Sequence, residues 1–188
     1  MAISASAGAG SAAALARALA PHAVIEKNLE RCTSAQQVCA ELSRIFNVGV
    51  TEVALMRVEG DILNFVFPTE LQAAGFVPLS SSKAVAARTA STRKVELFNN
   101  FMIVQHANVF ETIKLSTLGQ SSAPGANTIQ KLMTAPVTDS HHNVVGVVQV
   151  CRKGLTPTDC GSDFTLNDLQ NLEIASRAVG GLSFMHAV

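Results

Sequence analysis

The chain has 188 residues, 48% of them hydrophobic, and its 14 Lys and Arg balance its 14 Asp and Glu. This length suits one globular domain, and balanced charge without a Lys/Arg cluster argues against nucleic-acid binding. No apolar run approaches the roughly 20 residues that span a bilayer, and no signal peptide is recognisable, so a cytoplasmic protein without a membrane partner is expected.

The N-terminal segment is predicted to lie outside the folded domain. Residues 1–20 are rich in Ala, Gly and Ser and are expected to form a flexible or helical extension. Pro21 interrupts this composition, and a helix is predicted from about His22 to Arg31. The domain itself is expected to cover residues 21–188.

Ser34 marks the start of the next helix. Gln37 follows it three residues later, which is the pattern of a capping box. A helix over Ala35–Phe46 is therefore predicted. Its apolar face is made by residues at helical spacing, namely Val38, Leu42, Ile45 and Phe46.

Strands follow this helix. Glu52–Val58 and Ile62–Phe67 read as a hairpin whose tight turn places Gly60 at positive φ. Residues 70–75 are expected to form a turn or a short helical piece. A short edge strand is predicted over residues 76–79, since proline is tolerated at an edge.

A second helix is predicted from Lys83 to about Ser91, with Val85 facing inward and the serines at 80–82 as candidate N-caps. Lys94–Leu97 is expected to be a short strand. A loop with a turn at Asn99 and Asn100 should follow, then a helix over residues 104–114. Residues 119–127 read as a connector that suits a flap over a pocket.

The pattern around the polar segment 139–143 predicts the central hairpin of an antiparallel sheet. Ile129–Val137 and Val144–Cys151 are rich in β-branched residues and flank this segment. Pro136 lies near the end of the first strand, where its missing N–H does least harm. Gly146 in the second strand indicates a bulge or a close backbone contact.

The last element is a predicted helix over Leu166–Met185, capped by Thr165. Ala175 and Ala178 allow close packing of this helix. One apolar stripe is made by Leu169, Leu172, Val179 and Leu182. Helices around one antiparallel sheet describe an α+β domain.

The cysteines are predicted to be reduced, partly buried thiols: Cys32, Cys39, Cys151 and Cys160. There is no CxxC motif. Cys32 and Cys39 would be about 10 Å apart in one continuous helix, too far for a disulfide. His141 and His142 lack acidic or thiol partners nearby in sequence, so we expect no metal site and no catalytic residue.

In this order and spacing, several of these segments resemble the GAF family of sensory domains, over roughly Thr33–Met185. They are the entry helix, the hairpin through Gly60, the segment from Pro78-Leu79 to Lys94–Leu97, the strands Leu132–Val137 and Val145–Val150, and Phe164-Thr165 leading to Asp168-Leu169. The resemblance implies an α+β domain with a sheet of about six antiparallel strands. It also implies N- and C-terminal helices on one face, a small-molecule pocket on the other, and a non-enzymatic sensory or regulatory role.

GAF modules that bind cyclic nucleotides carry Asn-Lys, a Phe, and Asp-Glu. The matching places here hold Arg152-Lys153, Phe164 and Asp168-Leu169. We interpret Lys153 and Asp168 as an ion pair that ties the last strand to the final helix, with cyclic-nucleotide binding as a minor alternative.

Two other chemical subclasses of the family use cysteine. Tetrapyrrole-binding modules commonly have His after the attachment Cys, but Arg152 follows Cys151 and Gly161 follows Cys160. Methionine sulfoxide reductases of this fold need nearby thiols in the loops over the pocket. No cysteine occurs between Asn47 and Asn127, so a thiol-based reductase is a weaker alternative.

The candidate ligand-binding residues are Phe98, Asn99, Asn100, His106 and Phe110. A mostly apolar concavity with a few polar groups is how small-molecule sites are built, and Asn100 and His106 would hydrogen-bond a ligand between Phe98 and Phe110. The alternative is that the phenylalanines belong to the core and the polar residues cover a surface helix. No cofactor is identified, and axial haem binding by His106 has no supporting feature.

The terminal helices also predict a homodimer. Their apolar residues are Ile25, Leu29, Leu172, Val179 and Leu182, and a two-fold interface would use the same patch on both copies. A ligand signal would then pass through these helices to a partner protein. The alternative function is a dimerisation or interaction module whose pocket is vestigial.

Overall fold

The computed structural model describes residues 21–101 and 128–186. A six-stranded antiparallel sheet with the strand order β3-β2-β1-β6-β5-β4 forms the middle layer. The strands are β1 Val53–Glu59, β2 Ile62–Phe67, β3 Phe76–Pro78, β4 Glu96–Phe98, β5 Ile129–Thr138 and β6 Val144–Lys153.

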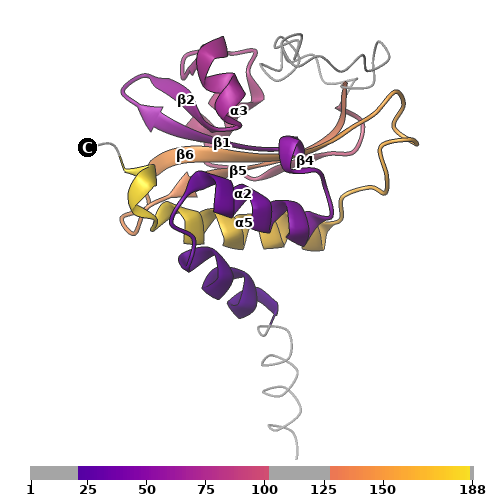
Figure 1. The fold of residues 1–188 in the computed structure, drawn as a ribbon. Coiled ribbons are helices and arrows are strands. Elements are labelled where there is room, and N and C mark those ends of the chain that lie inside the picture. The colour runs from indigo at the N-terminus through magenta and orange to yellow at the C-terminus, as the bar shows by residue number, and fades with distance from the viewer. Residues whose placement is uncertain (1–20, 102–127, 187–188) are drawn as a thin grey trace, which may run out of the picture.

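Helices cover both faces of the sheet (Figure 1). On one face lie α2 (Ala35–Phe46) and α5 (Leu166–Gly180), together with the helical residues 21–30. On the other face lies α3 (Val85–Thr92). Short 3-10 helices are formed by Val50–Glu52, Thr69–Ala74 and Ser183–Met185. The predicted α+β architecture, with the terminal helices on one face, is confirmed.

The β5–β6 hairpin is the inner part of this sheet. Every residue of β5 except Thr138 is buried, because both faces are covered. The register shifts by one residue near the turn, where Val137 faces Gly146 and Thr138 faces Val144. A Cβ built on Gly146 would overlap the Met56 carbonyl oxygen of β1, so the predicted close backbone contact is confirmed.

The predicted N-caps of α2 and α5, Ser34 and Thr165, are confirmed. The Ser34 hydroxyl accepts a hydrogen bond from the Gln37 N–H at 3.3 Å, and the Gln37 amide oxygen accepts from the Thr33 N–H at 2.8 Å. At the start of α5, Thr165 and Asp168 form a complete capping box. Each cap satisfies N–H groups that the first helical turn cannot pair internally.

The start of α3 differs from its prediction. The helix begins at Val85, two residues after Lys83, and its N-cap Ala84 has no side-chain oxygen. The Ser81 hydroxyl instead accepts from the Ala84 N–H at 3.3 Å, ahead of the helix. Alanines of α3 then pack directly on the sheet, which allows a close approach.

The end of α5 also differs from its prediction. The helix stops at Gly180 rather than at Met185, and a separate 3-10 turn buries Met185 beside Gly146. Two consecutive glycines weaken a helix. In addition, a Cβ on Gly180 would overlap the Thr138 carbonyl oxygen, so the backbone of α5 lies directly against the end of β5.

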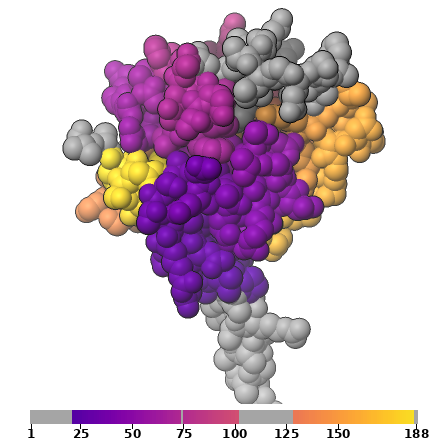
Figure 2. Space-filling model, viewed as in Figure 1, coloured from indigo at the N-terminus to yellow at the C-terminus, as the bar shows by residue number. Residues whose placement is uncertain are grey.

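The apolar residues that predicted a dimer surface mostly lie inside the chain's own core. Ile25 is 8% exposed, and the three residues Leu29, Leu172 and Val179 are fully buried. They pack with α2 and the sheet in one continuous core, so that surface is wrong as a dimer interface, and homodimerisation stays a prediction. In Figure 2 the indigo atoms near the N-terminus cover the centre and lower part of the visible face.

None of the helices within the two described ranges is long and apolar enough to cross a membrane.

Gly180→Ala is expected to lower the free energy of unfolding by roughly 1–3 kcal/mol, because the added methyl group overlaps the backbone of Thr138. Urea denaturation followed by circular dichroism measures this. The matched control is Gly181→Ala, since a Cβ there meets nothing nearer than the Ala178 carbonyl oxygen at 3.5 Å. Equal effects of the two substitutions would show that the contact of α5 with β5 is not tight.

Candidate ligand-binding site

An apolar cluster lies on the α3 face of the sheet, where β4, β5 and β6 meet. Its buried members are Val85, Phe101, Ile129, Leu132 and Cys151, with Phe98 packed against them. Beside this cluster the Thr89 hydroxyl donates to the Val85 carbonyl and lies 3.0 Å from the Thr134 hydroxyl. Since the Thr89 proton is used on Val85, Thr134 is the donor between the two threonines.

Phe98, at the end of β4, is fixed by aromatic and cationic contacts. Its ring lies 5.9 Å from the Phe101 ring at an interplanar angle of 72°, an edge-to-face arrangement. The Arg88 guanidinium of α3 lies 5.6 Å from the Phe98 ring centroid and forms an ion pair with Glu96 at 3.0 Å. One arginine therefore connects α3 with both ends of β4.

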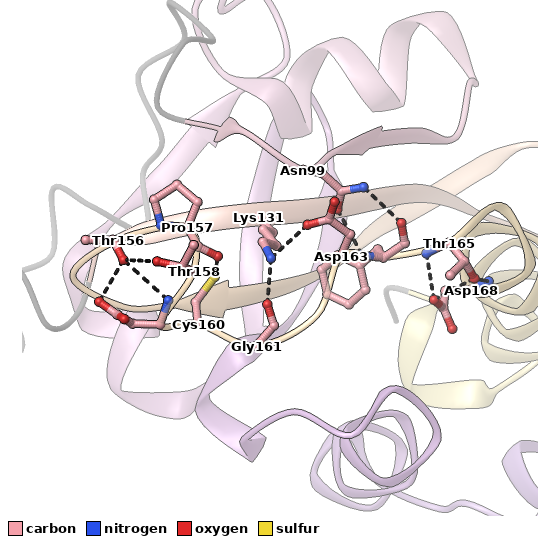
Figure 3. A network of polar contacts seen from close by, with 12 residues as sticks. Asn99, Lys131, Thr156, Pro157, Thr158, Cys160, Gly161, Asp163, Thr165 and Asp168 are labelled. Atoms are coloured by element: carbon pink, nitrogen blue, oxygen red, sulfur yellow. Dashed lines mark hydrogen bonds and ion pairs between the residues drawn. The ribbon is translucent and has the colours of Figure 1, made fainter.

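Asn99 joins the end of β4 to Phe164, the second residue before α5 (Figure 3). Its Oδ1 accepts from the Phe164 N–H, and its Nδ2 donates to the Phe164 carbonyl, both at 2.9 Å. The side-chain amide thus pairs with both backbone groups of one residue, as a neighbouring strand would. Thr165, the next residue, caps α5, so this contact links the α3 side of the sheet to the helix on the opposite side.

Lys131 of β5 contacts the loop between β6 and α5, residues 154–165 (Figure 3). Its Nζ donates to the Gly161 carbonyl at 2.6 Å and lies 2.8 Å from an oxygen of Asp163. The Lys131 side chain is 4% exposed, whereas that of Asp163 is 68% exposed. Because exposed ion pairs contribute little, the partly buried hydrogen bond to the Gly161 carbonyl is the more important contact.

Arg152 of β6 connects Phe164, in the loop before α5, to the end of α2. Its guanidinium donates to the carbonyls of Phe46 and Asn47 at 3.1 and 3.0 Å, and lies 4.7 Å from the centroid of the Phe164 ring. A cation at the C-terminus of a helix is favoured by the helix dipole. Arg152 is therefore engaged in a structural contact between α2, β6 and the segment before α5.

The predicted ion pair between Lys153 and Asp168 does not form. Asp168 accepts from the N–H and hydroxyl of Thr165 in the capping box, and the Lys153 ammonium donates to the Thr51 carbonyl at 2.9 Å. The ion pair from the sheet to the segment before α5 is made instead by Lys131, with Asp163. Spacing in the sequence did not reveal the pair of Lys131 and Asp163, because the β5–β6 hairpin separates the two residues along the chain.

Three of the thiols, those of Cys32, Cys39 and Cys151, are not activated. Burial raises the pKa of Cys151 to about 12 and also raises the pKa of Cys39. Burial, with Glu41 nearby, raises the pKa of Cys32. All four cysteines are free. A thiolate nucleophile needs a lowered pKa, which none of these three has.

No three His, Cys, Asp or Glu side chains within residues 21–101 and 128–186 come together as metal ligands.

No family model matches the sequence, and no curated protein matches it. Solved structures do match the fold. The GAF domain of a phosphoenolpyruvate-protein phosphotransferase from Acinetobacter has a TM-score of 0.58 at 11% identity, covering 87% of this chain and 90% of its own. The corresponding domain from Coxiella burnetii has a TM-score of 0.59 at 6% identity, with 86% and 89% covered.

The chain has the fold of GAF domains. A third GAF domain, from a two-component sensor histidine kinase of Bacillus halodurans, has a TM-score of 0.51 at 16% identity and covers 79% of this chain and 94% of its own. The structural similarity establishes the fold, and the low sequence identities establish no function.

Within the GAF fold, three of the predicted ligand residues are adjacent. Phe98 and Asn99 are partly buried at the end of β4, and Asn100 is exposed. His106 and Phe110, with the predicted helix over 104–114 and the connector 119–127, lie outside the described residues. The sequence did not predict that Arg88 lies beside Phe98. Arg88 is in α3 and Glu96 is the first residue of β4, so the short connection between these two elements allows Arg88 and Glu96 to pair.

Asn99→Ala is expected to lower the free energy of unfolding by about 1–3 kcal/mol, because two hydrogen bonds to Phe164 are lost. Thermal or urea denaturation measures this. Asn100→Ala, at the exposed neighbouring position, should change it by no more than about 0.5 kcal/mol. A result in which the Asn99 variant is as stable as the Asn100 variant would contradict the proposed importance of this contact.

Alkylation distinguishes the thiols. At pH 8 in the native state, N-ethylmaleimide is expected to modify partly exposed Cys32 while leaving Cys39 and Cys151 unmodified, because these two are buried and protonated. Peptide mass spectrometry reads the labelled positions, and labelling in denaturant provides the control. Rapid native modification of Cys151 would favour the thiol-reductase alternative.

Proposed function

We propose that this chain is a non-enzymatic sensory or regulatory GAF domain. It binds a small molecule on the α3 face of the sheet and passes the effect to α5. The observation that carries this proposal is the Asn99 contact, because it joins the strand end beside the predicted ligand residues to the backbone of Phe164. The fold shared with a domain of a sensor histidine kinase supports a regulatory role.

The ligand site we propose consists of four of the five residues predicted from the sequence, all except Asn99. Phe98 supplies an aromatic wall that Arg88 and Phe101 hold in place. Asn100 is exposed and has an amide group for hydrogen bonding, while His106 and Phe110 are proposed to complete the site. Asn99 has a different role in this scheme, since both polar atoms of its amide are bonded to Phe164.

The route from this site to α5 is short. A ligand that displaces the end of β4 changes the position of Asn99. Phe164 moves with Asn99 because the two are hydrogen-bonded, and the Thr165 cap moves because Thr165 follows Phe164 in the chain. The buried state and raised pKa of Cys151 argue against thiol catalysis on the same face. The proposed output is a changed packing of α5 that a partner protein or a second copy reads.

Native mass spectrometry of the protein purified from its own host, compared with its denatured mass, is the first test. We expect an additional mass that is lost on denaturation, and the same spectrum gives the oligomeric state. His106→Ala and Asn100→Ala should each lose this mass or weaken its binding about tenfold or more, since each removes a hydrogen-bonding group from the ligand.

His141→Ala is the matched control, because His141 is an exposed histidine in the β5–β6 turn, away from the proposed site. It should retain the ligand. A dimer with no bound mass would instead favour the dimerisation module with a vestigial pocket. Retention of the ligand by both site variants would show that the residues are assigned wrongly.

A further inference from the structure

We propose that a surface hollow at the edge of the sheet binds a small organic anion, with a phosphate monoester as its best-matched head group. The hollow has a volume of about 400 Å³ and lies between the α3–β4 connection, β5 and α5. Its cationic members are Arg93, Lys94 and Arg177. This site is separate from the ligand site proposed above, which lies at the other end of β4.

The hollow exists because β4 is short. β4 pairs with β5 from Glu96, opposite Thr134, so the rest of β5 toward Thr138 has no strand beside it on that edge within the described residues. Pro136, which has no N–H to leave unpaired, lies in this uncovered part of β5 and lines the hollow. The far wall is α5, held in place by the contact of Gly180 with Thr138.

The charges around the hollow do not cancel. Arg177 forms an i,i+4 ion pair with Glu173, and both line the hollow. Among the described residues, no carboxylate forms an ion pair with Arg93 or Lys94. Three cations therefore face one carboxylate, which leaves a net charge of about +2 for a ligand to balance. A phosphate monoester carries a charge of roughly −1.5 to −2 at pH 7 and matches it.

The backbone fixes the positions from which the two arginine side chains extend. Arg93 is the C-cap of α3 in the left-handed conformation, with φ 57°, and its N–H donates to the Thr89 carbonyl at 3.0 Å. Arg177 lies in the last turn of α5. Guanidinium groups bind phosphate oxygens through paired N–H donors, so two arginines on opposite walls suit one phosphate between them.

The remaining lining favours an organic ligand over a bare inorganic ion. Val95 and Pro136 supply apolar surface, and the hydroxyl-bearing residues Thr138 and Ser176 also line the hollow. The Ser176 hydroxyl is already used, since it donates to the Glu173 carbonyl at 2.9 Å. A volume of about 400 Å³ falls in the range typical of small-molecule sites and leaves room for a body attached to the phosphate.

The test is a calorimetric titration of the full chain with phenyl phosphate, benzoate and phenol as probes. Phenyl phosphate is expected to bind, benzoate to bind more weakly because it carries a single charge, and phenol not to bind. Arg93→Gln and Arg177→Gln should each weaken phenyl phosphate about tenfold, the cost of losing a charge-assisted hydrogen bond. Amide NMR shifts at Val95 and Ser176 should report the binding.

Arg44→Gln is the control. Arg44 also pairs with a carboxylate on its own helix, Glu41, and lines a different hollow between residues 21–30 and α2. The Arg44→Gln substitution removes the same charge as the other two substitutions and should change phenyl phosphate binding less than twofold. Because the substituted arginines are exposed, melting temperatures of the variants should match that of the unmodified protein.

The proposal would be overturned by an absence of phenyl phosphate binding at millimolar concentration, or by an equal loss in Arg44→Gln, which would mean unspecific charge attraction. Benzoate binding as tightly as phenyl phosphate would exclude the doubly charged head group. These results are independent of the ligand site near Asn100, because variants of that residue should bind phenyl phosphate normally.

Discussion

The burial of β5 on both of its faces is the constraint around which the molecule is arranged. Residues of β5 that face α2 and α5 join the large core, while Leu132 and Ile129 join the smaller cluster on the α3 face. A strand in this position is apolar along almost its whole length, and its neighbours must supply close contacts from both sides. Gly146 in the adjacent strand and Gly180 at the end of α5 allow such contacts, because a side chain at either position would overlap backbone atoms.

The sequence predicts the features that depend on neighbouring residues. The β5–β6 hairpin, the Ser34 and Thr165 caps and the turn at Gly60 follow from patterns a few residues long, and Gly60 has the expected positive φ of 60°. The order of these segments also led to the correct fold through their resemblance to GAF domains. Local chemistry is visible in a single sequence because its partners lie close by along the chain.

Features that depend on distant partners were not predictable in the same way. Asn99 is bonded to a residue 65 positions away, and Arg152 reaches carbonyls more than 100 positions before it. Lys131, rather than Lys153, forms the ion pair from the sheet to the segment before α5, and its other partner, Gly161, is 30 positions away. The close contact of Gly180 with the backbone of Thr138 likewise joins residues far apart in the sequence. For the candidate site, the sequence shows that residues 98–100 combine an aromatic and two amide side chains, but it does not show that the Asn99 amide is bonded to Phe164.

The two ends of α5 are held by different kinds of contact, and this has a mechanical consequence. At its C-terminal end the helix backbone touches the backbone of Thr138, so sliding or approach is blocked by overlap of atoms. At its N-terminal end, the segment just before it is held by the hydrogen bonds of Asn99 with Phe164 and by the ion pair of Lys131 with Asp163, polar contacts that water can replace singly. If ligand binding displaces α5 as proposed, the helix would therefore pivot about Gly180, and its first turn, farthest from that contact, would move most.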